Sequence, residues 1–78
     1  MNRYILYRIK WTEYERGFGQ REDGYTFHST KDLANKFIKN YWDRMPKKVV
    51  DVYSSPSAPE LVEVSREVYE RILAEEKN

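Results

Sequence analysis

Hydrophobic and polar residues alternate near the start of the chain. Within residues 4–11 the odd-numbered positions from Ile5 to Trp11 are apolar, whereas Arg8 and Lys10 lie between them. A period of two predicts a strand with one face buried.

A polar, glycine-rich segment follows. Residues 15–24 contain three glycines and end in Asp23-Gly24, a dipeptide typical of tight turns. A short alternating run over residues 25–28 comes next. We therefore predict a β-hairpin over residues 4–28 whose long tip has room for a bulge.

The apolar spacing then changes to that of a helix. Ser29 or Thr30 can cap its start, and Pro46 ends it because the residue before a proline is pushed out of the α region. Its apolar stripe is the widest in the chain and includes Phe37 and Trp42. We expect both rings to be buried against the sheet face that carries Ile5, Tyr7 and Ile9.

The second half of the chain predicts two extended segments and a second helix. Residues 49–53 and 61–64 have the extended pattern, and a proline- and serine-rich loop over residues 54–59 separates them. Ser65 can cap a final helix whose stripe includes Ile72.

The order of these elements predicts a single domain over residues 1–78, an α+β two-layer sandwich. Its antiparallel sheet has three to four strands and packs against two helices, in the order β-β-α-(β)-β-α. A chain of 78 residues has room for one thin core. The deep pocket that most enzymes need is therefore not expected.

The amino-acid composition indicates in which cellular compartment the protein works. The chain has no cysteine, which favours a reducing compartment, so we expect a cytoplasmic protein. Arg8 and Lys10 interrupt the first apolar residues, which is unlike a signal peptide. No stretch reaches the roughly 18 apolar residues of a membrane span, so no membrane partner is expected.

The net charge of +1 is unevenly distributed. Residues 1–48 hold eleven Lys and Arg against six Asp and Glu, whereas residues 49–78 hold three against seven. Folding either separates these charges into two opposed fields or interleaves and cancels them.

The residues that usually carry catalysis are sparse. His28 is the only histidine, so it cannot make a metal site by itself, and Ser29 is too close in sequence to use it as a catalytic base. Gly17-Phe-Gly19 lacks the third glycine and the following helix of a dinucleotide site. We therefore predict a protein that is not an enzyme, with no cofactor, no metal and no catalytic residues.

Three segments remain as candidates for binding a partner. The hairpin tip offers an aromatic ring between glycines, flanked by polar and basic side chains, and the loop after the helix offers a tyrosine. The alternatives are that the tip phenylalanine folds back over the sheet edge and that the loop is a plain connector. The predicted contact residues are Arg16, Phe18, Gln20, Arg21 and Tyr53.

A basic helix face and its continuation form the secondary candidate, with Lys36, Lys39, Lys47 and Lys48. Lysines on the outer face of an amphipathic helix are more often simply solvated.

Several local strings carry a resemblance. They are Gly17-Phe-Gly-Gln-Arg-Glu-Asp-Gly-Tyr25, the pairs Phe37-Ile38 and Tyr41-Trp42, Met45-Pro46, and Val-Glu-Val-Ser65 before the last helix. In these the chain resembles the small uncharacterised early proteins of large tailed bacteriophages that infect enterobacteria. That resemblance implies a host-takeover or anti-defence protein in the host cytosol, which binds and inhibits or modulates a host protein such as a restriction or CRISPR effector. It implies no catalytic residues.

Two further kinds of partner stay open. Exposed aromatic rings and lysines would also suit a nucleic-acid or nucleotide-binding module. A homodimer is possible too, because Leu6 gives the first strand a partly apolar outer face that edge-to-edge pairing would hide.

Overall fold

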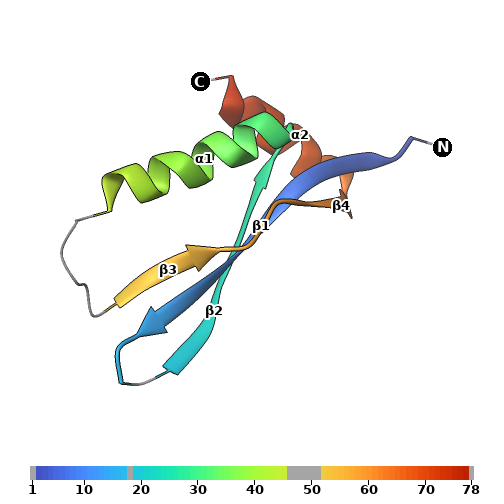
Figure 1. The fold of residues 1–78 in the computed structure, drawn as a ribbon. Coiled ribbons are helices and arrows are strands. Elements are labelled where there is room, and N and C mark those ends of the chain that lie inside the picture. The colour runs from blue at the N-terminus through green and yellow to red at the C-terminus, as the bar shows by residue number, and fades with distance from the viewer. Residues whose placement is uncertain (1, 18, 46–51, 78) are drawn as a thin grey trace.

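The computed structural model describes residues 2–17, 19–45 and 52–77. Those residues form two helices and a four-stranded antiparallel sheet (Figure 1), which confirms the predicted α+β sandwich and its element order. The elements are β1 (Tyr4–Glu15), β2 (Gly19–His28), α1 (Lys31–Arg44), β3 (Val52–Pro56), β4 (Glu60–Val64) and α2 (Arg66–Glu76).

β1 is the central strand. It pairs with β2 along one edge, and with β4 and then β3 along the other. Both edges of β1 are thus occupied over most of its length. In the described residues, the long open edges of the sheet are the outer edges of β2, β3 and β4, so the edge-to-edge pairing of two copies stays a prediction that rests on those strands.

β3 and β4 lie in line along the same edge of β1. Between them, the Ser57 N–H donates to the Lys10 carbonyl at 2.8 Å, and the Lys10 N–H donates to Ser57 Oγ at 3.0 Å. The predicted loop over residues 54–59 is therefore wrong for its first half, which is strand. Pro56 is tolerated because it stands at the end of β3.

The predicted hairpin is confirmed, but Asp23-Gly24 does not form its tip. Lys10 lies opposite Tyr25 and Thr12 opposite Glu22, so one extra residue is accommodated in β2. Gly24 has a φ of +95°, a conformation that suits the glycine of a β-bulge. The strands continue to Glu15 and Gly19, so the tip is shorter than the sequence predicts.

The core lies where α1 crosses the sheet. Ile9, Trp11 and Ala34 are buried, and Ile38 and Tyr41 of α1 pack against them. Both helices are capped by hydroxyls that the sequence indicates. Thr30 Oγ1 accepts from the Leu33 N–H at 3.1 Å, and Ser65 Oγ accepts from the Val68 N–H at 3.3 Å.

Three side chains differ from prediction in their burial. Phe37 and Trp42 are 44% and 43% exposed, because Ala34, which lies between them around the helix, is the residue of α1 that is fully buried against the sheet. Leu6 is fully buried and gives β1 no apolar outer surface. Tyr4, on the same side of β1 as Leu6, contacts Tyr69 of α2 with ring centroids 5.3 Å apart, so α2 covers this end of the strand.

Candidate binding surfaces

The described members of the predicted contact set lie at the end of the sheet far from α2 (Figure 1). Arg16 is exposed in the turn, Gln20 and Arg21 are exposed at the start of β2, and Tyr53 is in β3. The predicted residues Phe18, Lys47 and Lys48 lie outside the described residues.

Tyr14 joins two of the predicted contact residues. It lies opposite Gln20 of β2 and opposite Tyr53 of β3, so all three side chains point to the same face of the sheet. The rings of Tyr14 and Tyr53 stack, with centroids 5.4 Å apart and planes 22° apart. Tyr14 is absent from the predicted set because the strand predicted from the sequence ends at Trp11. In the structure β1 continues to Glu15, and Tyr14 lies on the face opposite to that of Trp11.

Arg21 points to the opposite face from its neighbour Gln20. There its guanidinium lies 3.0 Å from the Glu13 carboxylate. The Arg21 side chain is well exposed, so this ion pair contributes at most about 1 kcal/mol. The structure therefore does not place Arg21 together with Gln20 and Tyr53.

The face that carries Tyr14 continues along the hairpin. We name this surface the tyrosine face; its residues are Lys10, Thr12, Tyr14, Gln20, Glu22, Tyr25, Tyr53 and Ser55. α1 packs on the other side, against Ile9 and Trp11, and leaves the tyrosine face open. Tyr25 is 43% exposed and Tyr53 is 37% exposed.

Arg8 and Glu22, two charged residues on and beside the tyrosine face, both contact Tyr25. The Arg8 guanidinium lies over the Tyr25 ring, 4.6 Å from its centroid, and Arg8 also forms an ion pair with Glu60. A hydrogen bond to the Glu22 carboxylate raises the pKa of the Tyr25 phenol above its ordinary value. These contacts orient Tyr25 before any partner arrives.

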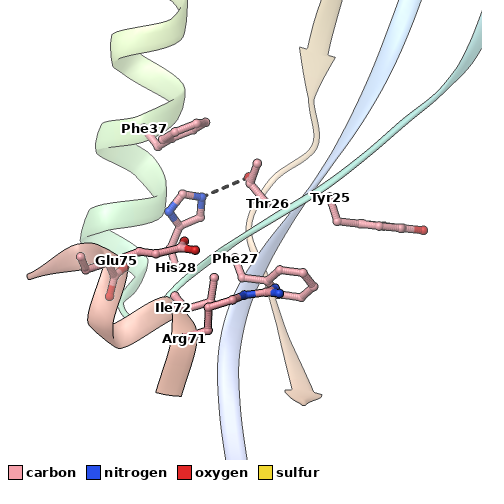
Figure 2. Close-up of a pocket in the computed structure, with 9 residues that line it drawn as sticks. Tyr25, Thr26, Phe27, His28, Phe37, Arg71, Ile72 and Glu75 are labelled. Atoms are coloured by element: carbon pink, nitrogen blue, oxygen red, sulfur yellow. Dashed lines mark hydrogen bonds between the residues drawn. The ribbon is translucent and has the colours of Figure 1, made fainter. Parts of the chain in front are cut away.

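His28 lies in a second surface feature, a hollow of about 430 Å³ between β2, α1 and α2 (Figure 2). The Trp11 Nε1–H donates to Thr26 Oγ1 at 2.9 Å, and His28 Nε2 lies 3.1 Å from the same oxygen. With Oγ1 accepting from Trp11, the Thr26 hydroxyl is free to donate to an unprotonated Nε2. The Phe37 ring packs against His28 with centroids 4.9 Å apart. These contacts make His28 a buried, hydrogen-bonded part of the fold.

The stability of the domain should depend on the protonation of His28. Burial lowers the pKa of His28 below its ordinary value, although the Glu76 carboxylate opposes this shift. The unfolded chain therefore binds the proton more tightly than the folded chain. We expect the free energy of unfolding to be highest above the unfolded pKa of about 6.5 and to decrease as the pH falls from there toward the folded-state pKa.

Urea unfolding at about pH 7.5 and about pH 5.5, above the range where carboxylates titrate, measures this effect. His28→Gln keeps a polar side chain but does not titrate. Its stability should change less between the two pH values than that of the wild type, and an equal change would contradict the assignment.

Lys36 and Lys39 are exposed on α1, where Asp32 and Asp43 are also exposed. The helix packs on the side of the sheet opposite the tyrosine face, so these lysines do not extend that surface. The secondary basic face and the predicted contact residues are therefore separate surfaces.

Among residues 2–17, 19–45 and 52–77, no three His, Cys, Asp or Glu side chains come together as a possible metal site. Neither α1 nor α2, the helices of that part of the chain, is long and apolar enough to cross a membrane.

Comparisons with known proteins do not add to these surfaces. The chain matches no family model, no curated protein and no solved structure.

Proposed function

We propose that this chain is a small phage-type interaction protein that binds a host protein in the host cytosol and modulates or inhibits it, for example a restriction or CRISPR effector. Its role is binding rather than catalysis, and it uses no cofactor. The exposed tyrosines of the tyrosine face are the observation that carries the proposal. The host context follows from the resemblance of the sequence to early phage proteins.

The tyrosine face suits a protein partner for two reasons. Tyrosine is among the residues that most often anchor interfaces, because a large ring is buried there at a small entropic cost. Here the rings are already held: Tyr53 stacks on Tyr14, and Tyr25 lies against Arg8. Side chains that are fixed before binding lose little freedom when a partner covers them.

A nucleic-acid or nucleotide-binding module is the second candidate. Stacked aromatic rings on an antiparallel sheet are a common platform for unpaired bases, and Lys10 and Arg8 lie beside them. However, Glu22 and Glu60 balance these two cations. Attraction to a phosphate backbone is therefore weak, which favours the protein partner.

Replacing Tyr25 and Tyr53 together by alanine should weaken binding to the host partner at least tenfold, about 1.4 kcal/mol, because both anchor rings are lost. The tagged chain is incubated with nuclease-treated enterobacterial lysate, the protein band that it retains is purified, and the affinity of each variant for that protein is titrated.

Leu61→Ala is the matched control, since Leu61 is exposed on the opposite face of the sheet. It should bind like the wild type. Equal binding by the double tyrosine variant would exclude the tyrosine face. Binding of a single-stranded oligonucleotide that weakens steeply with salt, together with a protein band that is retained from untreated lysate but not from nuclease-treated lysate, would instead support the second candidate.

A further inference from the structure

One flank of α1 exposes a row of side chains that the sheet does not cover. Leu33, Phe37, Asn40 and Arg44 follow one another at spacings of four, three and four residues, and all are exposed. Such spacings place side chains along one line of a helix surface. Phe37 contacts Trp11 and His28 with part of its ring and leaves the rest open.

Two hollows meet at the middle of this row. One, of about 300 Å³, lies toward the start of α1, and the other, of about 310 Å³, lies toward its end. Phe37 and Asn40 line both hollows and therefore mark the centre of one continuous surface. We name this surface the helix flank.

The two ends of the helix flank carry opposite charge. Glu75 and Glu76 of α2 line the hollow near the start of α1, together with Lys36, which gives a net charge of −1. Arg44 lines the hollow near the end of α1 and gives +1. Glu76 already accepts a hydrogen bond from the Ser29 N–H at 3.0 Å. Of the two carboxylates that line this hollow in the described part of the chain, Glu75 is therefore the one left for an outside cation.

We propose that the helix flank binds a second copy of this chain, with the two α1 helices antiparallel about a two-fold axis through Phe37 and Asn40. A two-fold axis at the centre of a surface places each end on the opposite end of the other copy. Arg44 of each protomer then faces Glu75 of its partner. This charge pattern is complementary to itself, which is why a second copy fits better than an unrelated protein.

The residues at the centre agree with this arrangement. Each Asn40 amide has both a donor and an acceptor, so two of them can pair across the axis. The Phe37 rings bury each other's exposed part, as the ridges of packed helices do. The dimer leaves both tyrosine faces free, because those lie on the far side of each sheet. The proposal therefore stands independently of the proposed function.

Analytical ultracentrifugation from about 1 µM to about 1 mM tests the proposal, since a contact this small should dissociate in the micromolar range. The wild type should pass from monomer to dimer over that range. Asn40→Asp sets two carboxylates against each other at the axis and should raise the dissociation constant at least tenfold. Asn35→Asp is the matched control: it makes the same change at an exposed site on the opposite side of the helix and should leave the dimer intact.

A charge swap tests the antiparallel orientation. Arg44→Glu should weaken the dimer, and adding Glu75→Arg to the same chain should restore it. A wild type that stays monomeric at about 1 mM, Asn40→Asp and Asn35→Asp variants that behave alike, or a double variant without rescue would each overturn the proposal. A monomeric wild type whose binding of the captured host protein is lost in Asn40→Asp would assign the helix flank to that host protein instead.

Discussion

Trp11→Ala is expected to lower the free energy of unfolding by about 3 to 5 kcal/mol, the range for removing a buried aromatic side chain. Trp11 is only 6% exposed. Its ring packs edge-on against Tyr41 and Phe37 with centroids 4.9 and 5.9 Å away, and its Nε1–H donates to Thr26. A loss of that size is a large part of the stability of a small domain, so much of the variant protein should be unfolded. Urea denaturation followed by circular dichroism measures it.

Trp42→Ala is the matched control for this substitution. Trp42 is the other tryptophan, and it lies on the exposed side of α1. Its removal should cost about 1 kcal/mol, the value of an average point mutation. Equal losses for the two variants would contradict the position of the core between β1 and α1.

Tyr41→Phe is expected to cost about 2 kcal/mol, because one hydroxyl satisfies two backbone groups. The Tyr41 hydroxyl donates to the Ser54 carbonyl and accepts from the Ser54 N–H at 3.0 Å. An unsatisfied buried polar group costs roughly 1 to 3 kcal/mol, and because Ser54 is only half-buried we expect the lower end of that range for each group.

Tyr53→Phe removes the same atom from Tyr53, which precedes Ser54 in β3. Within the described residues its hydroxyl makes no hydrogen bond, so the change in unfolding free energy should stay within about 0.5 kcal/mol. Thermal unfolding of both variants gives the comparison. If Tyr41→Phe is as stable as Tyr53→Phe, the hydroxyl does not tie α1 to β3.

The sequence predicts the hairpin and both helices because their signals are local. Alternation sets the face of β1, and the hydroxyls of Thr30 and Ser65 cap the helices where the structure has them. The position of the hairpin tip is predicted wrongly from Asp23-Gly24, because a glycine at positive φ suits a turn and a β-bulge equally well. Which of the two forms depends on pairing with β1, and no local pattern shows that.

The extent of β3 is predicted only in part, for a similar reason: an extended segment is expected up to Tyr53, but the strand continues through Ser54 to Pro56. The two serines and the proline at its end are typical of loops, and only their pairing with β1 makes them part of a strand. The burial of α1 is also decided by tertiary contacts. Its apolar stripe is wider than the sheet can cover, so Phe37 and Trp42 flank the contact that Ala34 makes.

The candidate site is predicted only in part. The sequence places Gln20 and Tyr53 in two separate candidate segments, and in the structure both lie opposite Tyr14, which the sequence does not single out. Arg21 points to the other face because neighbouring residues of a strand alternate. The sequence suggests which side chains are unusual for a core, whereas strand register decides which of them share a face.

The position of β1 between β2 and the β3–β4 edge also determines when the domain can fold. Tyr4 lies opposite Val64, and Glu13 lies opposite Ser54, so β1 waits for segments that are synthesised later in the chain. Until then, the hairpin and α1 can form locally, but one edge of β1 stays open to other chains. Leu6 also lacks the cover that α2 supplies. Folding of these elements therefore finishes only after α2 leaves the ribosome, and a translation product that stops before β3 should aggregate or be degraded.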